Sequence, residues 1–280
     1  MSIPNHPMVA YDALARRCGI DRLFLVLSFD CDTDQDAEAA LELAPWLDRL
    51  GVKATYAVPG AQLRRQAVAY RRLAEDGRAF LNHGDRPHAE WRETRYYGMT
   101  FYHQLTTAEI VADMRAGDQA VREVLGRTPT GFRAPHFGCF QAPEQLALIH
   151  DTARALGYRL CSNTIPDFAL TRGPFFAAGG VLEVPLFGSY RYPSTLLDSW
   201  TYLSNYETYT LKDEYDELFA ETVDRMTADG LAGLLCYYVD PAHVRGQAPF
   251  ERAMARIAQR GIPSLNFDDV ANLAVGVLSP

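Results

Sequence analysis

Two aspartates follow the first long apolar run of the chain. The segment reads Ser28-Phe29-Asp30-Cys31-Asp32, and the run before it has the length of a strand. Because side chains alternate between the two faces of a strand, Asp30 and Asp32 are expected to point the same way. Neighbouring carboxylates repel each other unless a cation, a shared proton or an arginine lies close by. The pair is therefore a candidate site of chemistry, with a turn or helix cap as the alternative interpretation.

Two histidines stand at the end of another apolar run, in Asn82-His83-Gly84-Asp85-Arg86-Pro87-His88. Imidazole is the commonest nitrogen ligand for zinc, and two histidines with one carboxylate leave coordination positions open for water and substrate. We therefore expect a divalent metal site, with His103 as a reserve ligand in the same loop. Two unrelated loop histidines are the alternative.

An arginine ends a further apolar stretch, in Gly131-Phe132-Arg133-Ala134-Pro135-His136. A guanidinium that faces an acidic site binds a carboxylate bidentately and holds it ionised. Arg133 is therefore expected to face the acidic site, with a surface ion pair as the alternative.

A repeated alternation of strand and helix patterns positions these residues. The continuous apolar run 23–29 is typical of a strand covered on both faces. The other expected strands are 54–58, 79–82, 131–133, 158–161, 181–186, 231–239 and 262–266. Helices are expected at about 40–50, between 60 and 77, and at 106–125, 143–157, 213–229, 249–260 and 268–278. About eight such strands predict one α/β domain over residues 1–280, most simply an irregular (β/α) barrel of seven or eight strands. An open doubly wound sheet is the main alternative. Barrel sites lie at the carboxyl ends of strands, where the three motifs stand.

The composition is that of an ordinary globular protein. The 280 residues are 48% hydrophobic, enough to bury a core without disulfides, and the five cysteines are widely scattered. The net charge of −8 argues against a general nucleic-acid binder, because no excess of Lys and Arg exists to meet phosphates. The sequence has no apolar run of about 20 residues, so no membrane span is expected. The first residues lack a signal-peptide pattern, which predicts a cytoplasmic protein.

Taken in order, the three motifs resemble those of the polysaccharide deacetylase (NodB-homology, carbohydrate esterase family 4-like) superfamily. That family carries Asp-Asp or Asp-x-Asp after its first strand, His-Ser/Thr-x-x-His after its third and Arg-x-Pro-aromatic after its fourth. Softer matches at 50–60, 157–163 and 182–185 extend the resemblance over about residues 22–270.

The resemblance implies a metal-dependent amide hydrolase. Its metal, Zn²⁺ as the first choice, would polarise an amide carbonyl and acidify a bound water molecule. The implied roles are metal ligation by Asp32, His83 and His88, general base for Asp30, orientation of that base by Arg133, and oxyanion binding by a backbone N–H near Pro135 and His136.

The spacing of the histidines departs from the family pattern. His83 and His88 are five residues apart where the family has four, so the segment between them needs a loop or a bulged turn. Gly84 and Pro87 permit such a turn. Alternatively, His103 replaces one of the two ligands.

The general acid departs as well. The family supplies it from a late His-Pro motif, but this chain reads Asp240-Pro241-Ala242-His243. Asp240 would serve as the acid if burial or a nearby anion raised its pKa, and His243 is the other candidate. The alternative is that Asp240 caps a helix or pairs with an arginine and the site is altered or inactive.

Two long loops, 83–105 and 187–212, are expected to border the active site. Both are rich in aromatic residues, which pack well against sugar rings, although a packed aromatic cover is equally compatible with the pattern. The candidate substrate-binding residues are Pro135, His136, Trp91, Tyr190 and Trp200.

These features together predict a hydrolase that removes an acetyl or formyl group from an amino sugar. The lack of a signal-peptide pattern favours an intracellular glycan or O-antigen precursor as substrate. A metal-independent hydrolase of a cyclic amide or ureide from the same superfamily is one alternative. A catalytically inactive, sugar-binding relative is the other.

Overall fold

A curled, mostly parallel sheet runs through the centre of the computed structural model, which describes residues 6–93, 95–200, 203–205 and 210–277. Its strands follow the spatial order β12-β1-β2-β3-β6-β7-β9-β8, and β13 pairs with the first half of β1. All pairs are parallel except β8 with β9. The strands are β1 (Leu23–Asp30), β2 (Ala54–Val58), β3 (Ala79–Asn82), β6 (Gly131–Phe132), β7 (Leu160–Cys161), β8 (Phe176–Ala178), β9 (Val181–Glu183), β12 (Gly233–Val239) and β13 (Ser264–Leu265).

All eight strands expected from the sequence belong to this sheet, so the predicted irregular (β/α) barrel is confirmed. The barrel is open: in the described part of the chain, no strand pairing joins its two edge strands, β8 and β12. The chain after β9 bridges this gap, because the Phe187 N–H donates to the Cys236 carbonyl of β12 at 2.8 Å. The Tyr237 hydroxyl donates to the Gly188 carbonyl at 2.9 Å next to it.

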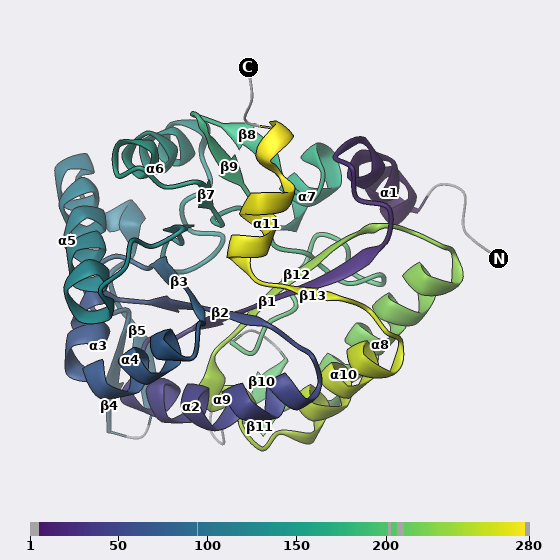
Figure 1. Ribbon diagram of the computed structural model, residues 1–280, viewed down its shortest axis with the longest axis horizontal. Coiled ribbons are helices and arrows are strands. Elements are labelled where there is room, and N and C mark those ends of the chain that lie inside the picture. Colours follow the sequence, from purple (N-terminus) through teal and green to yellow (C-terminus); the bar gives the residue numbers. More distant parts are fainter. Residues whose placement is uncertain (1–5, 94, 201–202, 206–209, 278–280) are drawn as a thin grey trace.

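Helices surround the outside of the curled sheet (Figure 1). They are α1 (Pro7–Arg17), α2 (Asp34–Arg49), α3 (Gly60–Arg65), α4 (Ala67–Glu75), α5 (Thr107–Leu125), α6 (Pro143–Ala155), α7 (Pro166–Arg172), α8 (Asp213–Ala228), α9 (Pro241–Val244), α10 (Ala248–Gln259) and α11 (Phe267–Leu273). The sequence did not predict α1, α7 or α9. The last helix is shorter than expected and is followed by a 3₁₀ turn, η2 (Val275–Val277). None of the described helices is long and apolar enough to cross a membrane.

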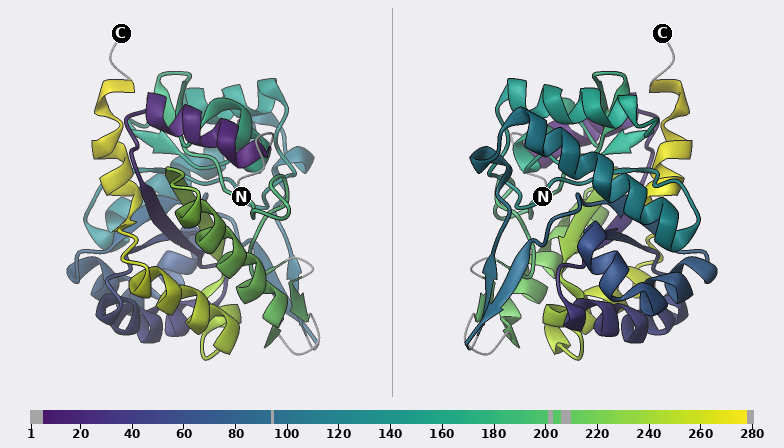
Figure 2. Two further views of the ribbon diagram at one scale, coloured as in Figure 1. Left: turned by 90° about the vertical axis from the view of Figure 1, so that its right-hand side faces the viewer. Right: turned by 90° about the vertical axis from the view of Figure 1, so that its left-hand side faces the viewer.

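Two β-hairpins lie in the segments that were expected to be long loops. The first pairs β4 (Ala89–Arg92) with β5 (Arg95–Gly98), and η1 (Tyr102–Gln104) follows it. The second pairs β10 (Ser204–Asn205) with β11 (Thr210–Leu211). Both hairpins project from the same side of the molecule (Figure 2).

The N-terminal helix protects the outer edge of β12. The Tyr11 hydroxyl of α1 donates to the Leu234 carbonyl at 2.9 Å and accepts from the Leu234 N–H at 3.0 Å. Gly233 allows this approach, because a Cβ there would lie 2.2 Å from the Tyr11 ring. One buried hydroxyl therefore satisfies two backbone groups that the sheet leaves unpaired.

Replacing Tyr11 with Phe should lower the free energy of unfolding by about 2 kcal/mol, because it leaves a buried N–H and a buried carbonyl without partners. Urea denaturation monitored by circular dichroism measures the change. Tyr56→Phe is the matched control, since the Tyr56 hydroxyl is equally buried and has no hydrogen-bond partner in the described part of the chain. Equal losses in the two variants would contradict the edge-protecting role.

Candidate functional site

A cavity of about 320 Å³ opens at the carboxyl ends of the barrel strands. Acidic and imidazole side chains dominate its polar lining, and no Lys or Arg lines it among the described residues. The acidic and imidazole groups are Asp30, Asp32, Asp36, Asp198, Asp240, His83, His88, His136 and His243. The aromatic part of the lining comprises Tyr96, Phe101, Phe137, Trp200 and Tyr238.

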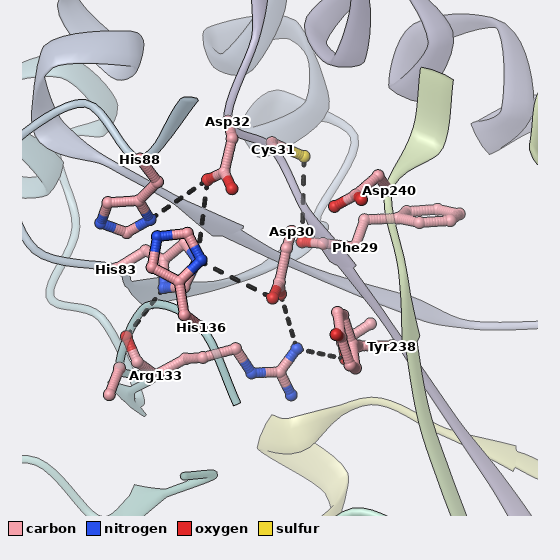
Figure 3. A network of polar contacts seen from close by, with 12 residues as sticks. Phe29, Asp30, Cys31, Asp32, His83, His88, Arg133, His136, Tyr238 and Asp240 are labelled. Carbon is pink, nitrogen blue, oxygen red and sulfur yellow. Dashed lines mark hydrogen bonds and ion pairs between the residues drawn. The ribbon is translucent and has the colours of Figure 1, made fainter. Parts of the chain in front are cut away.

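Asp32, His83 and His88 converge on one point of this cavity. Asp32 Oδ1 lies 3.7 Å from His83 Nε2 and 3.2 Å from His88 Nδ1. One ligand atom from each residue lies within 4.8 Å of the others (Figure 3). Asp32 Oδ1 and both ring nitrogens of His88 are buried, yet they form no hydrogen bond in the described part of the chain. Because unpaired buried polar atoms are costly, this donor set fits a divalent metal ion.

The protonation states of these residues suit metal binding. Burial, assisted by the nearby His88, lowers the pKa of His83 to about 4. Burial and the nearby His136 lower the pKa of His88 to about 3. Both rings are therefore neutral at pH 7, which is the form that binds a metal. Burial raises the pKa of Asp32 to about 6, so a bound cation would be needed to stabilise its charged form fully.

A buried carboxylate on α5 stabilises the loop that separates the two histidines. Asp113 Oδ1 accepts hydrogen bonds from the backbone N–H groups of Asp85 and Arg86, at 3.0 and 2.8 Å. Gly84 precedes them with φ +75°, a conformation that favours glycine. The extra residue is thus absorbed in a tight loop, as the sequence required. His103, the reserve ligand, is exposed in η1 and does not line the cavity.

Arg133 holds Asp30 and His83 from beneath the cavity. Its side chain is fully buried and donates from Nη1 to Asp30 Oδ1 and to Ser28 Oγ, both at 2.7 Å. Its backbone carbonyl lies 2.8 Å from His83 Nδ1. With neutral His83, this contact places the proton on Nδ1 and leaves Nε2 free to face Asp30 and Asp32. The guanidinium also lies against the Tyr238 ring.

Asp240 and His243 stand on the opposite side of the cavity. Asp240 Oδ2 lies 3.3 Å from His243 Nδ1, and the Trp200 ring stacks on the His243 ring at 4.8 Å. Burial, followed by repulsion from Asp36, Asp32 and Asp30, raises the pKa of Asp240 well above its usual range. Burial lowers the pKa of His243. Asp240 therefore tends to hold a proton where an ordinary aspartate would not.

The segment after β6 carries His136 in a strained conformation. Its φ is +57°, Nε2 lies 2.5 Å from the Met99 carbonyl, and its ring stacks on Phe101. Backbone strain of this kind persists where the surroundings enforce it, often at functional sites. His136 lines the cavity, whereas Pro135 is buried and is not part of the described lining.

The aromatic residues predicted to bind substrate do not all line the cavity. Trp200 lines the cavity as expected. Tyr190 does not line it, because it is buried against the N-terminal segment with its ring stacked on His6 at 3.9 Å. Trp91 lies in β4, but its side chain falls outside the described part of the structure. Among the other aromatic residues of 187–212, Tyr202, Tyr206 and Tyr209 also fall outside the described residues.

Three aspartates of the site were not predicted. Asp36 and Asp113 lie on helices, where the sequence pattern of an aspartate is that of an ordinary helix cap or a solvent-exposed residue. Asp198 accepts from the Tyr238 hydroxyl at 2.8 Å and from the backbone N–H of Trp200 at 2.9 Å. Its position beside Trp200 in an aromatic segment was the only available signal.

Comparisons with solved structures agree with this fold. A putative polysaccharide deacetylase from Mycobacterium smegmatis superposes with a TM-score of 0.65 at 17% identity, covering 100% of this chain and 95% of its own. A family 4 carbohydrate esterase from Streptomyces lividans, solved in complex with acetate, gives 0.53 at 16% identity, with coverage of 86% and 91%. A mutant pseudoenzyme of the same esterase family, with restored activity, gives 0.51 at 11% identity, with coverage of 92% and 68%.

No curated protein matches the sequence. A sequence model of the family described as polysaccharide deacetylase matches residues 21–160, which include Asp30, Asp32, His83, His88 and Arg133. The match therefore contains every strand-end residue that builds the candidate metal-binding side of the cavity. Since it spans half of the chain, this protein belongs to the polysaccharide deacetylase family.

Proposed function

We propose that this protein is a metal-dependent hydrolase that removes an acetyl or formyl group from the nitrogen of an amino sugar. The observation that carries the proposal is the convergence of Asp32, His83 and His88 beside an arginine-bound aspartate, with Asp32 Oδ1 and both His88 ring nitrogens buried and without a hydrogen bond among the described residues. Asp32, His83 and His88 would hold the metal, Zn²⁺ in our proposal. When bound, the ion would supply Lewis acidity to the acyl carbonyl and to a water molecule.

Asp30 is the general base of the proposed reaction. Its carboxylate lies at the carboxyl end of β1, with Oδ1 bound to Arg133 and Oδ2 3.8 Å from His83 Nε2. Arg133 fixes the direction of this carboxylate, which lets Asp30 accept a proton as water attacks the acyl carbon. Arg133 is therefore a positioning residue in our proposal.

The pair of Asp240 and His243 supplies the proton to the leaving amine. Asp240 replaces the histidine of the family motif, and its raised pKa keeps a proton available near neutral pH. The C–N bond breaks as the nitrogen takes this proton, which gives a free amino group and a carboxylate. The structure of the Streptomyces lividans esterase holds acetate, which is the product we expect from an acetylated substrate.

The shape of the cavity favours a single sugar unit of an unpolymerised glycan precursor. Its lining comes from segments on every side, including both hairpin-bearing regions through Tyr96, Gly98, Leu196 and Trp200. A volume of about 320 Å³ is at the small end for ligand pockets.

Release of acetate or formate from N-acetylated and N-formylated hexosamines tests the proposed activity. We expect release from the zinc-loaded protein, because the site combines a base, an acid and ligands for a Lewis acid. Enzymatic quantification of acetate and formate measures it. Binding of the sugars without release from any of them would favour the inactive, sugar-binding alternative, which the replacement of the family histidine by Asp240 motivates.

Replacing Asp32 with Asn should abolish stoichiometric zinc binding, because the amide removes the charged ligand of the triad. The affinity for zinc should fall by more than the roughly 10–100-fold loss that follows removal of a group that only supports a metal ligand. Isothermal titration calorimetry and metal analysis of the purified protein measure it. His103→Ala is the control and should bind zinc like the wild type. Hydrolysis by a metal-free wild-type protein would instead support the metal-independent alternative.

Replacing Asp240 with Asn should lower kcat by about 100-fold or more, because the amide cannot donate the proton that the leaving amine needs. In the wild type, kcat should fall as the pH rises through the raised pKa of the acid, since the donor form disappears. This basic limb should be absent from the Asn variant. Steady-state rates between pH 5 and pH 10, roughly, give both results. Full rates in both Asp240→Asn and His243→Ala would show that neither residue is the acid.

A further inference from the structure

Asp36 occupies the N3 position of a capping box at the start of α2. The Thr33 N–H and hydroxyl donate to Asp36 Oδ2 at 2.9 and 2.7 Å, and the Asp36 N–H donates to Thr33 Oγ1 at 3.2 Å. The chain builds the same motif at α5 from Thr106 and Glu109, with distances of 2.9, 2.8 and 3.3 Å. The two boxes are thus equivalent as local helix caps.

Their surroundings differ. Glu109 is exposed, and its other contact is a 3.5 Å approach to Arg86 at the surface. Asp36 is only 2% exposed, lines the cavity and forms no ion pair with Lys or Arg among the described residues. Burying a carboxylate without a cationic partner costs free energy that a helix cap alone does not require. A second role is therefore expected of Asp36.

Two further hydrogen bonds show what Asp36 connects. The backbone N–H of Asp32, a candidate metal ligand, donates to Asp36 Oδ2 at 3.1 Å. The backbone N–H of Ala242, in α9 and next to His243, donates to Asp36 Oδ1 at 3.0 Å. The two oxygens of one rigid carboxylate therefore bind the metal-binding side and the acid side of the cavity, from segments more than 200 residues apart.

We propose that Asp36 is a positioning residue that sets the distance between the metal-ligand turn and the acid helix. The inference rests on the proposed function for the roles of Asp32 and His243. Asp36 touches neither the substrate nor the reacting atoms in this scheme. It acts through two hydrogen bonds from the backbone. One comes from the N–H of Asp32, and the other from the N–H of Ala242, which adjoins His243.

Asp36→Asn tests the proposal, because the amide keeps the size of the side chain but can no longer accept on both sides. We expect exchange of the Ala242 amide hydrogen to accelerate at least about tenfold. Zinc affinity should fall by about 10–100-fold, as it does when a supporting group of a metal ligand is lost. At saturating zinc, kcat should fall by about tenfold or more with little change in KM. Hydrogen–deuterium exchange by NMR, calorimetry with zinc and steady-state kinetics measure these effects.

Glu109→Gln is the matched control, since it makes the same acid-to-amide change in the equivalent capping box. It should lower the melting temperature but leave Ala242 exchange and zinc affinity within about twofold of the wild type. If Asp36→Asn behaves in the same way, Asp36 is a helix cap only and the proposal is wrong. Faster exchange with unchanged zinc affinity would also overturn it. A wild type that binds no zinc would defeat the proposed function alone, and unchanged Ala242 exchange would then still overturn the proposed connection.

Discussion

The buried ion pair between Arg133 and Asp30 is the interaction on which the site depends. A fully buried guanidinium is stable only where several acceptors surround it. Ser28, Asp30 and Ser162 accept from Arg133 at 2.7, 2.7 and 3.1 Å. The first two belong to β1 and the third follows β7. The backbone carbonyl of Arg133 orients His83. One residue thus fixes the proposed base and one proposed ligand relative to each other, and any shift between β1, β3 and β6 would disturb both.

The charge balance of the cavity follows from this pairing. Five aspartates line the cavity, and Arg133 compensates only Asp30. Each of the others is stabilised in its own way. Asp36 and Asp198 accept several hydrogen bonds, and Asp240 has a raised pKa. Asp32 faces two neutral imidazoles, and its Oδ1 accepts no hydrogen bond in the described part of the chain. Asp32 is the one whose surroundings favour a nearby cation, which agrees with the proposed metal position.

The sequence allowed the convergence of Asp32, His83 and His88 to be predicted, because simple periodic rules govern it. Side-chain alternation along β1 put Asp30 and Asp32 on one side, and the parallel arrangement brought the ends of β3 and β6 beside them. The other elements depend on long-range contacts that no local pattern encodes. In the sequence, Asp113 has the pattern of an ordinary helix residue, and only the fold brings it to the loop between His83 and His88. Tyr190 was misplaced because aromatic character does not tell which side of a loop faces the cavity.

The acid side shows how a family site can keep its geometry with different residues. A histidine side chain at position 240 would reach further from the backbone than the aspartate does. The shorter aspartate gives up that reach, and His243 returns an imidazole to the cavity one helical turn later. In the proposed reaction, the 3.3 Å contact between the two side chains lets them share a proton and act together as the donor. Trp200 stacks on the imidazole, and Asp36 accepts a hydrogen bond from the short helix that carries it. A substitution that would inactivate an isolated motif is therefore compatible with function where the surrounding fold supplies the second group.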